Sequence, residues 1–90
     1  MRKLRTETEI MVDILSHVSS QQCTVSEIVK EINVPYSRAS EYVNLLISKK
    51  LVSIYEEKEK KFINITREGS EFLSEYRKLR HLLNIYGLKP

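Results

Sequence analysis

The sequence predicts a mainly α-helical fold with a small β-hairpin, in the order helix, helix, helix, two strands, helix. Three observations lead to this prediction. Thr6 and Thr24 each stand three residues before a glutamate and directly before a run of apolar residues with helical spacing, the pattern of a capping box. After Lys50 the pattern changes to β-branched and aromatic runs. From Thr66 onward a long helical pattern follows.

The first helix is expected to begin after Thr6 and to end at about Ser19. Glu9 supplies the carboxylate of its capping box. One apolar stripe runs along this segment and consists of Ile10, Met11, Ile14, Leu15 and Val18. Residues 19–23 are expected to form a polar loop into the second helix.

The second helix is expected to begin after Thr24, whose hydroxyl can accept a hydrogen bond from the Glu27 amide, and to end at about Ile32. Pro35 enforces this end, because a proline disfavours the α conformation at Val34 and has no amide hydrogen of its own. The apolar stripe of this helix consists of Val25, Ile28, Val29 and Ile32.

The third helix follows at once, with Pro35 in its first turn or Ser37 as its cap. Its apolar stripe consists of Tyr36, Ala39, Val43 and Leu46, widened by Tyr42 and Ile47. The opposite face carries Ser37, Arg38, Ser40, Glu41, Asn44 and Ser48. Two helices joined by a tight turn, the second with a small polar face, are typical of a helix-turn-helix. A helical hairpin with a solvated face gives the same pattern, so both interpretations stay open for this stretch.

Two runs of β-branched and aromatic residues, 51–55 and 61–65, flank five charged residues and are expected to form a β-hairpin. A hairpin directly after a helix-turn-helix is a wing. Its tip, residues 56–60, has no Gly, Pro or Asn, so no turn type is specified. Because the lysines and glutamates of the tip and the second run cancel, the strands are expected to support the core rather than to read bases.

The last helix is expected to run from Thr66 to about Tyr86, where Gly87 permits a left-handed stop. At ~1.5 Å per residue it would span roughly 30 Å, about the width of a small domain. Apolar residues repeat at intervals of four and three, as in a short coiled coil: Phe72, Tyr76, Leu79, Leu83 and Tyr86, with Leu73, Leu82 and Ile85 beside them. This repeat favours a homodimer joined by the helix over a helix folded back on its own core. We therefore expect residues 1–65 to form a core with a basic amino-terminal arm, and residues 66–90 to form a dimerisation helix of the same domain.

The composition is that of one ordinary globular domain, with 90 residues, of which 41% are hydrophobic and 30% charged. No uninterrupted apolar run is longer than Leu45–Ile47, which is far too short for a membrane span. Residues 1–9 lack the apolar core of a signal peptide, so we expect a cytoplasmic protein. The net charge is only +3, but the basic residues avoid residues 6–34, where Lys30 stands alone among five acidic residues. This distribution fits an amino-terminal arm, a third helix and part of the last helix that face a phosphate backbone, or a solvated surface of mixed charge.

The sequence indicates no catalytic residue, metal site or cofactor. Cys23 is the only cysteine, and a small residue at the edge of a loop is favoured over a redox switch or a bridge between subunits. His17 and His81 are isolated, and no Cys/His spacing indicates a metal. With no glycine-rich phosphate loop and no nucleophile that has a histidine and an acid as partners, we do not expect an enzyme. A small apolar effector between the last helix and the core stays an open alternative.

Three segments resemble the small archaeal winged helix-turn-helix proteins: residues 33–36, 42–52 and 63–69. Within that group the chain is similar to the 10a-type chromatin-associated proteins of Sulfolobales, over about residues 4–86, and more distantly to multiple-antibiotic-resistance-type and PadR-type repressors. The resemblance implies a DNA-binding homodimer joined by its last helix. The chain departs from the pattern at Lys50, where a glycine commonly ends the recognition helix, and at its wing tip, which lacks glycine.

These features predict a protein that binds double-stranded DNA with its third helix in the major groove, as a transcriptional regulator or a chromatin-associated protein. The candidates for contacts to bases or phosphates are Ser37, Arg38, Ser40, Glu41 and Asn44, of which Arg38 suits guanine. The candidates for phosphate contacts are Arg2, Lys3, Arg5, Lys49, Lys58, Lys60 and Lys61. The residues expected at the dimer interface are Phe72, Tyr76, Leu79, Leu82, Leu83 and Tyr86. The alternative is a winged helix that contacts proteins in a transcription or remodelling complex, which the small net charge and Glu41 favour.

Overall fold

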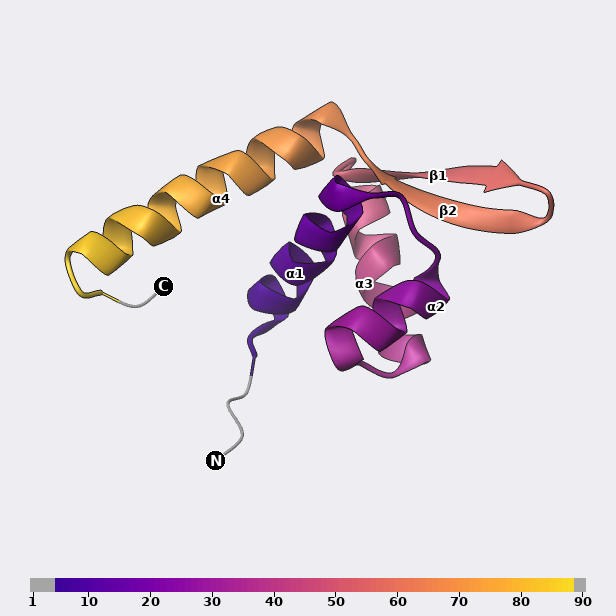
Figure 1. The fold of residues 1–90 in the computed structure, drawn as a ribbon, viewed down its shortest axis with the longest axis horizontal. Coiled ribbons are helices and arrows are strands. Elements are labelled where there is room, and N and C mark those ends of the chain that lie inside the picture. Colours follow the sequence, from indigo (N-terminus) through magenta and orange to yellow (C-terminus); the bar gives the residue numbers. More distant parts are fainter. Residues whose placement is uncertain (1–4, 89–90) are drawn as a thin grey trace.

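Short helices form the body of the molecule, a β-hairpin extends from one side of this body, and a long helix extends on the other side (Figure 1). The computed structural model describes residues 5–88. In chain order the elements are α1 (Glu7–Ser20), α2 (Val25–Ile28), the π-helical turn η1 (Val29–Asn33), α3 (Tyr36–Ser48), β1 (Val52–Glu57), β2 (Lys60–Ile65) and α4 (Arg67–Ile85). The order confirms the predicted fold class, mainly α with one hairpin.

Threonine side chains cap the amino-terminal ends of α1, α2 and α4. The Thr6 hydroxyl accepts a hydrogen bond from the Glu9 amide (3.1 Å), and the Glu9 carboxylate accepts one from the Thr6 amide (3.2 Å). Thr24 and Glu27 form the same reciprocal pair at 3.2 and 3.0 Å. These bonds satisfy amides that have no partner within their helix, so α1 and α2 begin where the sequence predicts.

The turn between the second and third helices depends on Asn33 and Pro35. The π-helical turn ends at Asn33, whose φ of 62° reverses the chain, one residue later than predicted. Val34 is extended, as a residue before proline prefers. Pro35 is then the N-cap residue of α3, which begins at Tyr36 and has no side-chain cap. Ser37 therefore lies inside the helix and does not cap it.

The core lies where α1, α3 and the base of the hairpin meet. Its largest fully buried side chains are Ile14, Leu15, Cys23, Ile28, Val43, Leu46 and Ile63. Five positions of the apolar stripes predicted for the first three helices are not fully buried. Four of them are partly buried and pack against the core: Met11, Val25, Val29 and Ile47. Val12, which lay outside the predicted stripe of α1, is buried. Tyr36 is 61% exposed, because it is the first residue of α3 and lies at the edge of the face that packs.

Cys23 pairs with strand β2 through a single β-bridge, whereas the sequence predicts only a small residue at the edge of a loop. Its amide donates to the Ile63 carbonyl (3.3 Å), and the Ile63 amide donates to the Cys23 carbonyl (2.7 Å). The side chain is fully buried. Burial and the neighbouring Glu27 carboxylate raise the pKa of the Cys23 thiol to about 11, so the thiol stays protonated at neutral pH and is a poor nucleophile.

The hairpin is longer and more regular than the sequence predicts. Its antiparallel register runs from Val52 opposite Ile65 to Glu57 opposite Lys60. Lys58 and Glu59 alone form the turn, with φ of 51° and 65°, which is the type I′ geometry that suits the twist of a hairpin. Val52 and Ile63 at the base are buried in the core, whereas the strand residues near the tip are exposed.

The carboxy-terminal end of α3 has the Schellman geometry. The Leu51 amide donates to the Leu46 carbonyl (3.0 Å), and the Lys50 amide donates to the Ile47 carbonyl (2.9 Å). This geometry places Lys50 in the left-handed region, with φ of 63°. The end of α4 has the same geometry, with Gly87 at the equivalent position and φ of 70°. The two helices therefore end alike, but only α4 has the residue that adopts this conformation without strain.

Lys50→Gly is expected to raise the free energy of unfolding by about 1 kcal/mol, because glycine avoids the clash of a Cβ atom in the left-handed region. Urea unfolding followed by circular dichroism measures the change. The matched control is Lys49→Gly, since Lys49 has an ordinary φ of −92° and gains nothing from glycine. Equal stabilities of the two variants would contradict the prediction.

Candidate nucleic-acid interface

One face of α3 has no packing partner within residues 5–88. The exposed residues of this face are Ser37, Arg38, Glu41, Asn44 and Ser48. Ser40 lies at its edge and is half-buried. The opposite face, with Ala39, Tyr42, Val43 and Leu46, is buried. The structure therefore brings all five candidates on α3 to one side of the molecule, with Ser40 less accessible than the others.

Two hollows lie beside α3 and have different linings. One has a volume of about 420 Å³ and separates α3 from the start of α1; it is lined by Glu7, Arg38, Glu41, Tyr42 and Leu45. The other has a volume of about 600 Å³ and lies between α2, α3 and β2; it is lined by Thr24, Val25, Ser26, Glu27, Tyr36, Lys60, Lys61 and Phe62. The middle of α3 thus lines the first hollow, and only its first residue, Tyr36, reaches the second.

Tyr36 is the residue of this surface that the sequence analysis missed. The helical spacing placed it in the core stripe, but the structure exposes it in the groove that also holds Lys60 and Lys61. A signal was present in the sequence. Tyr36 directly follows the Val34-Pro35 pair that ends the preceding helix, so it is expected at the start of the next helix. A residue at a helix end has fewer neighbouring side chains to pack against.

The hairpin presents its lysines next to glutamates. Lys61 stands opposite Glu56, and Lys60 stands opposite Glu57, in the strand register. Lys58 lies in the turn, beside Glu59. Opposite charges directly across a strand pair attract each other and weaken the positive potential that a phosphate would meet. The wing therefore attracts phosphate groups less strongly than its lysines alone would.

The remaining phosphate candidates lie apart from one another. Lys49 is exposed at the far end of α3, where it borders an apolar hollow of about 300 Å³ that Thr8, Leu46 and Phe72 also line. The Arg5 guanidinium donates to the Asp13 carboxylate (2.9 Å) and to the carbonyl oxygen of Ile32. Arg5 is thus held against α1 and the end of η1 by contacts within the chain. Arg2 and Lys3 lie outside the described residues.

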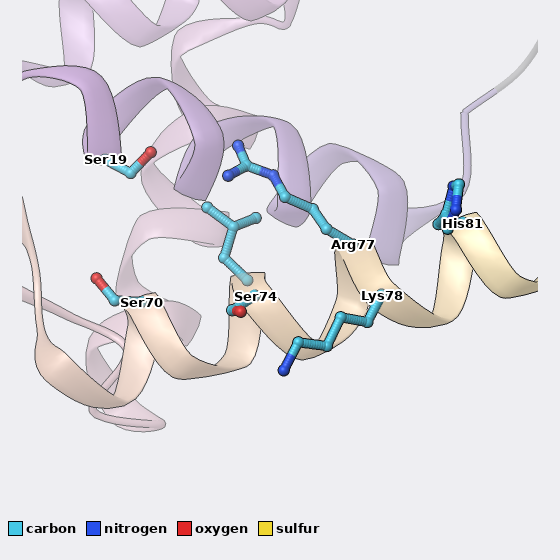
Figure 2. Close-up of a pocket in the computed structure, with 7 residues that line it drawn as sticks. Ser19, Ser70, Ser74, Arg77, Lys78 and His81 are labelled. Atoms are coloured by element: carbon cyan, nitrogen blue, oxygen red, sulfur yellow. The ribbon is translucent and has the colours of Figure 1, made fainter.

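A second basic surface lies between α1 and α4, where no residue of α3 lines it (Figure 2). This surface is a groove lined by Ser19, Ser70, Ser74, Arg77, Lys78 and His81. Arg77 donates to the Ser16 hydroxyl (3.4 Å), and Lys78 pairs with Glu75 on α4 (3.3 Å). Two of its cationic side chains thus already have partners within the chain.

Helix α4 carries an apolar strip that is largely uncovered in the part of the chain that the structure describes. Among its large apolar side chains only Leu73 is fully buried, and Tyr76 and Leu83 are half-buried. Phe72, Leu79, Leu82 and Tyr86 are exposed. In Figure 1 the carboxy-terminal half of α4 extends away from the body. The exposed part of the strip therefore consists of predicted dimer residues and has no covering partner within residues 5–88.

Residues 5–88 contain no group of three His, Cys, Asp or Glu side chains that is placed to hold a metal ion. Over the same residues, no helix combines the length and hydropathy that crossing a membrane requires.

The structure thus contains an exposed polar helix, α3, with a short packed helix before it in the chain and a β-hairpin after it. A family profile described as winged helix-turn-helix matches residues 4–84, nearly the whole chain. The chain belongs to the winged helix-turn-helix family. In this winged helix-turn-helix, α2, η1 and α3 form the helix-turn-helix, and β1 with β2 forms the wing.

Solved structures share the winged helix-turn-helix fold over most of their length. Sso10a-2, a DNA-binding protein from Sulfolobus solfataricus, is 26% identical, with 91% of this chain and 88% of that chain covered and a TM-score of 0.72. A PadR family transcription regulator from Clostridium difficile is 24% identical, with 86% and 96% covered and a TM-score of 0.71. The homodimeric DNA-binding domain of Mb0332 from Mycobacterium bovis is 18% identical, with 83% and 72% covered and a TM-score of 0.73. No curated protein matches the chain by sequence.

Proposed function

We propose that this chain is a DNA-binding regulator that inserts α3 into the major groove of double-stranded DNA. The observation that carries the proposal is the polar face of α3, which is exposed and has no packing partner within residues 5–88. A helix is the element whose width fits the major groove. The similarity to Sso10a-2, which is a DNA-binding protein, supports the same assignment.

Within this proposal Arg38 is the principal base contact. Its guanidinium is exposed and has no hydrogen bond or ion pair within residues 5–88, so it is available for the bidentate contact that guanine accepts. Ser37, Ser40 and Asn44 contact base edges or phosphates beside it. Phosphate groups are contacted by Tyr36, Lys60 and Lys61 from the groove between α2 and the wing, and Lys49 and Lys58 make outer phosphate contacts.

The active form in this proposal is a homodimer joined by the apolar strip of α4, with residues 1–65 as the DNA-binding part and residues 66–90 as the dimerisation part. The exposed strip supports it, because a run of large apolar side chains along one helix face usually marks an interaction site. The homodimeric state of the Mb0332 domain is a second support. A two-fold dimer reads two half-sites about one helical turn apart.

Arg38→Ala is expected to weaken binding to a preferred duplex about 5- to 150-fold, the factor for losing one bidentate base contact. Fluorescence anisotropy with promoter and random duplexes across a salt series measures it. The control is Arg80→Ala, an exposed arginine on α4. An equal loss on every duplex would make Arg38 a phosphate contact. Absence of binding by the unaltered protein at low salt would contradict the DNA assignment and favour the protein-contact alternative.

A further inference from the structure

Glu41 is an unexpected residue for a surface that approaches DNA. It lies in the middle of the exposed face of α3, one turn after Arg38 and one turn before Asn44, and it is exposed. Within residues 5–88 it has no hydrogen bond or ion pair, although it lines the same hollow as Arg38 and Glu7. A glutamate carboxylate is negatively charged at neutral pH.

A free carboxylate at this position lowers the affinity for DNA in general. Duplex DNA carries one negative charge for each ~1.7 Å of its axis, and charges closer than about 8 Å are poorly screened at physiological salt. A protein that only packages DNA binds every sequence better with a neutral residue at position 41. The carboxylate therefore needs a compensating contact that some sequences provide and others lack.

The major groove offers that contact at few places. The cytosine N4 amino group donates a hydrogen bond to a carboxylate with no acceptor beside it, whereas adenine places its N7 acceptor next to the N6 donor, and the guanine edge and thymine O4 present only acceptors, which repel the carboxylate. Arg38, one turn earlier on the same face, has the opposite preference, since a guanidinium donates to the O6 and N7 atoms of guanine. Arg38 therefore selects guanine, and Glu41 selects cytosine at a neighbouring position.

We infer that Glu41 is a specificity-determining residue that requires a cytosine beside the guanine read by Arg38, and that it rejects thymine or guanine at that position. This inference rests on the proposed DNA-binding function and deepens it. It assigns the chain to the sequence-specific regulators rather than to general packaging proteins. Glu41 contributes to selectivity by weakening binding at wrong sequences.

The test is selection of duplexes from a randomised pool with the unaltered protein, Glu41→Gln and Glu41→Ala, followed by anisotropy on the selected duplex and on its cytosine-to-thymine variant. The unaltered protein is expected to prefer the cytosine duplex by about ten-fold or more, in line with the cost of one mismatched contact. Both variants are expected to lose the cytosine preference and to bind random duplexes several-fold more tightly. Glu68→Gln, the same charge change on exposed α4, is expected to alter neither quantity.

Two results separate the failure of this inference from the failure of the proposed function. Steeply salt-dependent binding with no preference for cytosine in the unaltered protein, or an unchanged preference in both Glu41 variants, would overturn the role of Glu41 and leave DNA binding intact. No binding of any duplex at low salt would overturn both. Thermal unfolding of the variants confirms that an exposed helical substitution has left the fold in place.

Discussion

Gly69→Ala is expected to lower the free energy of unfolding by about 2–3 kcal/mol, near the upper end of the cost of overpacking. A Cβ atom at Gly69 would lie 2.0 Å from the carbonyl oxygen of Leu51 and 2.8 Å from Cγ1 of Ile65. The Leu51 carbonyl is fixed in place, because it accepts a hydrogen bond from the Thr66 amide (3.1 Å). The clash outweighs the gain in helix propensity of about 1 kcal/mol that alanine brings.

Urea unfolding at one fixed protein concentration measures this loss. The matched control is Ser70→Ala, the next residue along α4, which is exposed and is expected to change stability by less than about 0.5 kcal/mol. If Gly69→Ala is as stable as this control, α4 shifts freely relative to the end of α3. The contact between α4 and Leu51 would then not hold the long helix in its observed direction.

Leu79→Glu is expected to convert a dimer of this chain into a monomer, with the dissociation constant raised at least ~100-fold, since an unpaired carboxylate in an apolar interface costs several kcal/mol. Leu79 lies at the middle of the apolar strip, seven residues from both Phe72 and Tyr86. It is 52% exposed in the single chain. The substitution therefore removes an interface contact while the fold of each chain persists.

Sedimentation equilibrium of the unaltered protein and the variant measures this change, and circular dichroism checks that α4 is retained. The matched control is Ser74→Glu, which adds the same charge to exposed α4 beside the polar groove of Figure 2 and is expected to leave the dimer intact. A dimeric Leu79→Glu variant would place the interface elsewhere. A monomeric unaltered protein at high concentration would contradict the dimer itself.

Features that depend on neighbours in the chain were predictable from the sequence. The capping boxes at Thr6 and Thr24 place the starts of α1 and α2, because both hydrogen bonds of each box lie within four residues. Pro35 fixes the break before α3 through its own ring. The polar face of α3 was also predictable, since helical spacing alone assigns these side chains to one side.

Features that depend on distant segments were not predictable in this way. Cys23 pairs with Ile63, forty positions along the chain, and a single bridging residue leaves no periodic pattern. The type I′ turn at Lys58 and Glu59 goes against the preference of both residues and follows from the register of the two strands. Spacing assigned Tyr36 to the core, but exposure depends on where the covering helices end.

The sequence by itself therefore determined the order of the helices, the starts of α1, α2 and α4, the wing and the polar face of α3, because local hydrogen bonds and side-chain periodicity are encoded over a few residues. Only the tertiary structure decided that Arg5 is tied to the carbonyl oxygen of Ile32, that Gly69 must stay free of a side chain, and that Tyr36 borders a groove with Lys60. Each of these depends on distances between segments that are far apart in the chain, and packing of the whole core sets those distances.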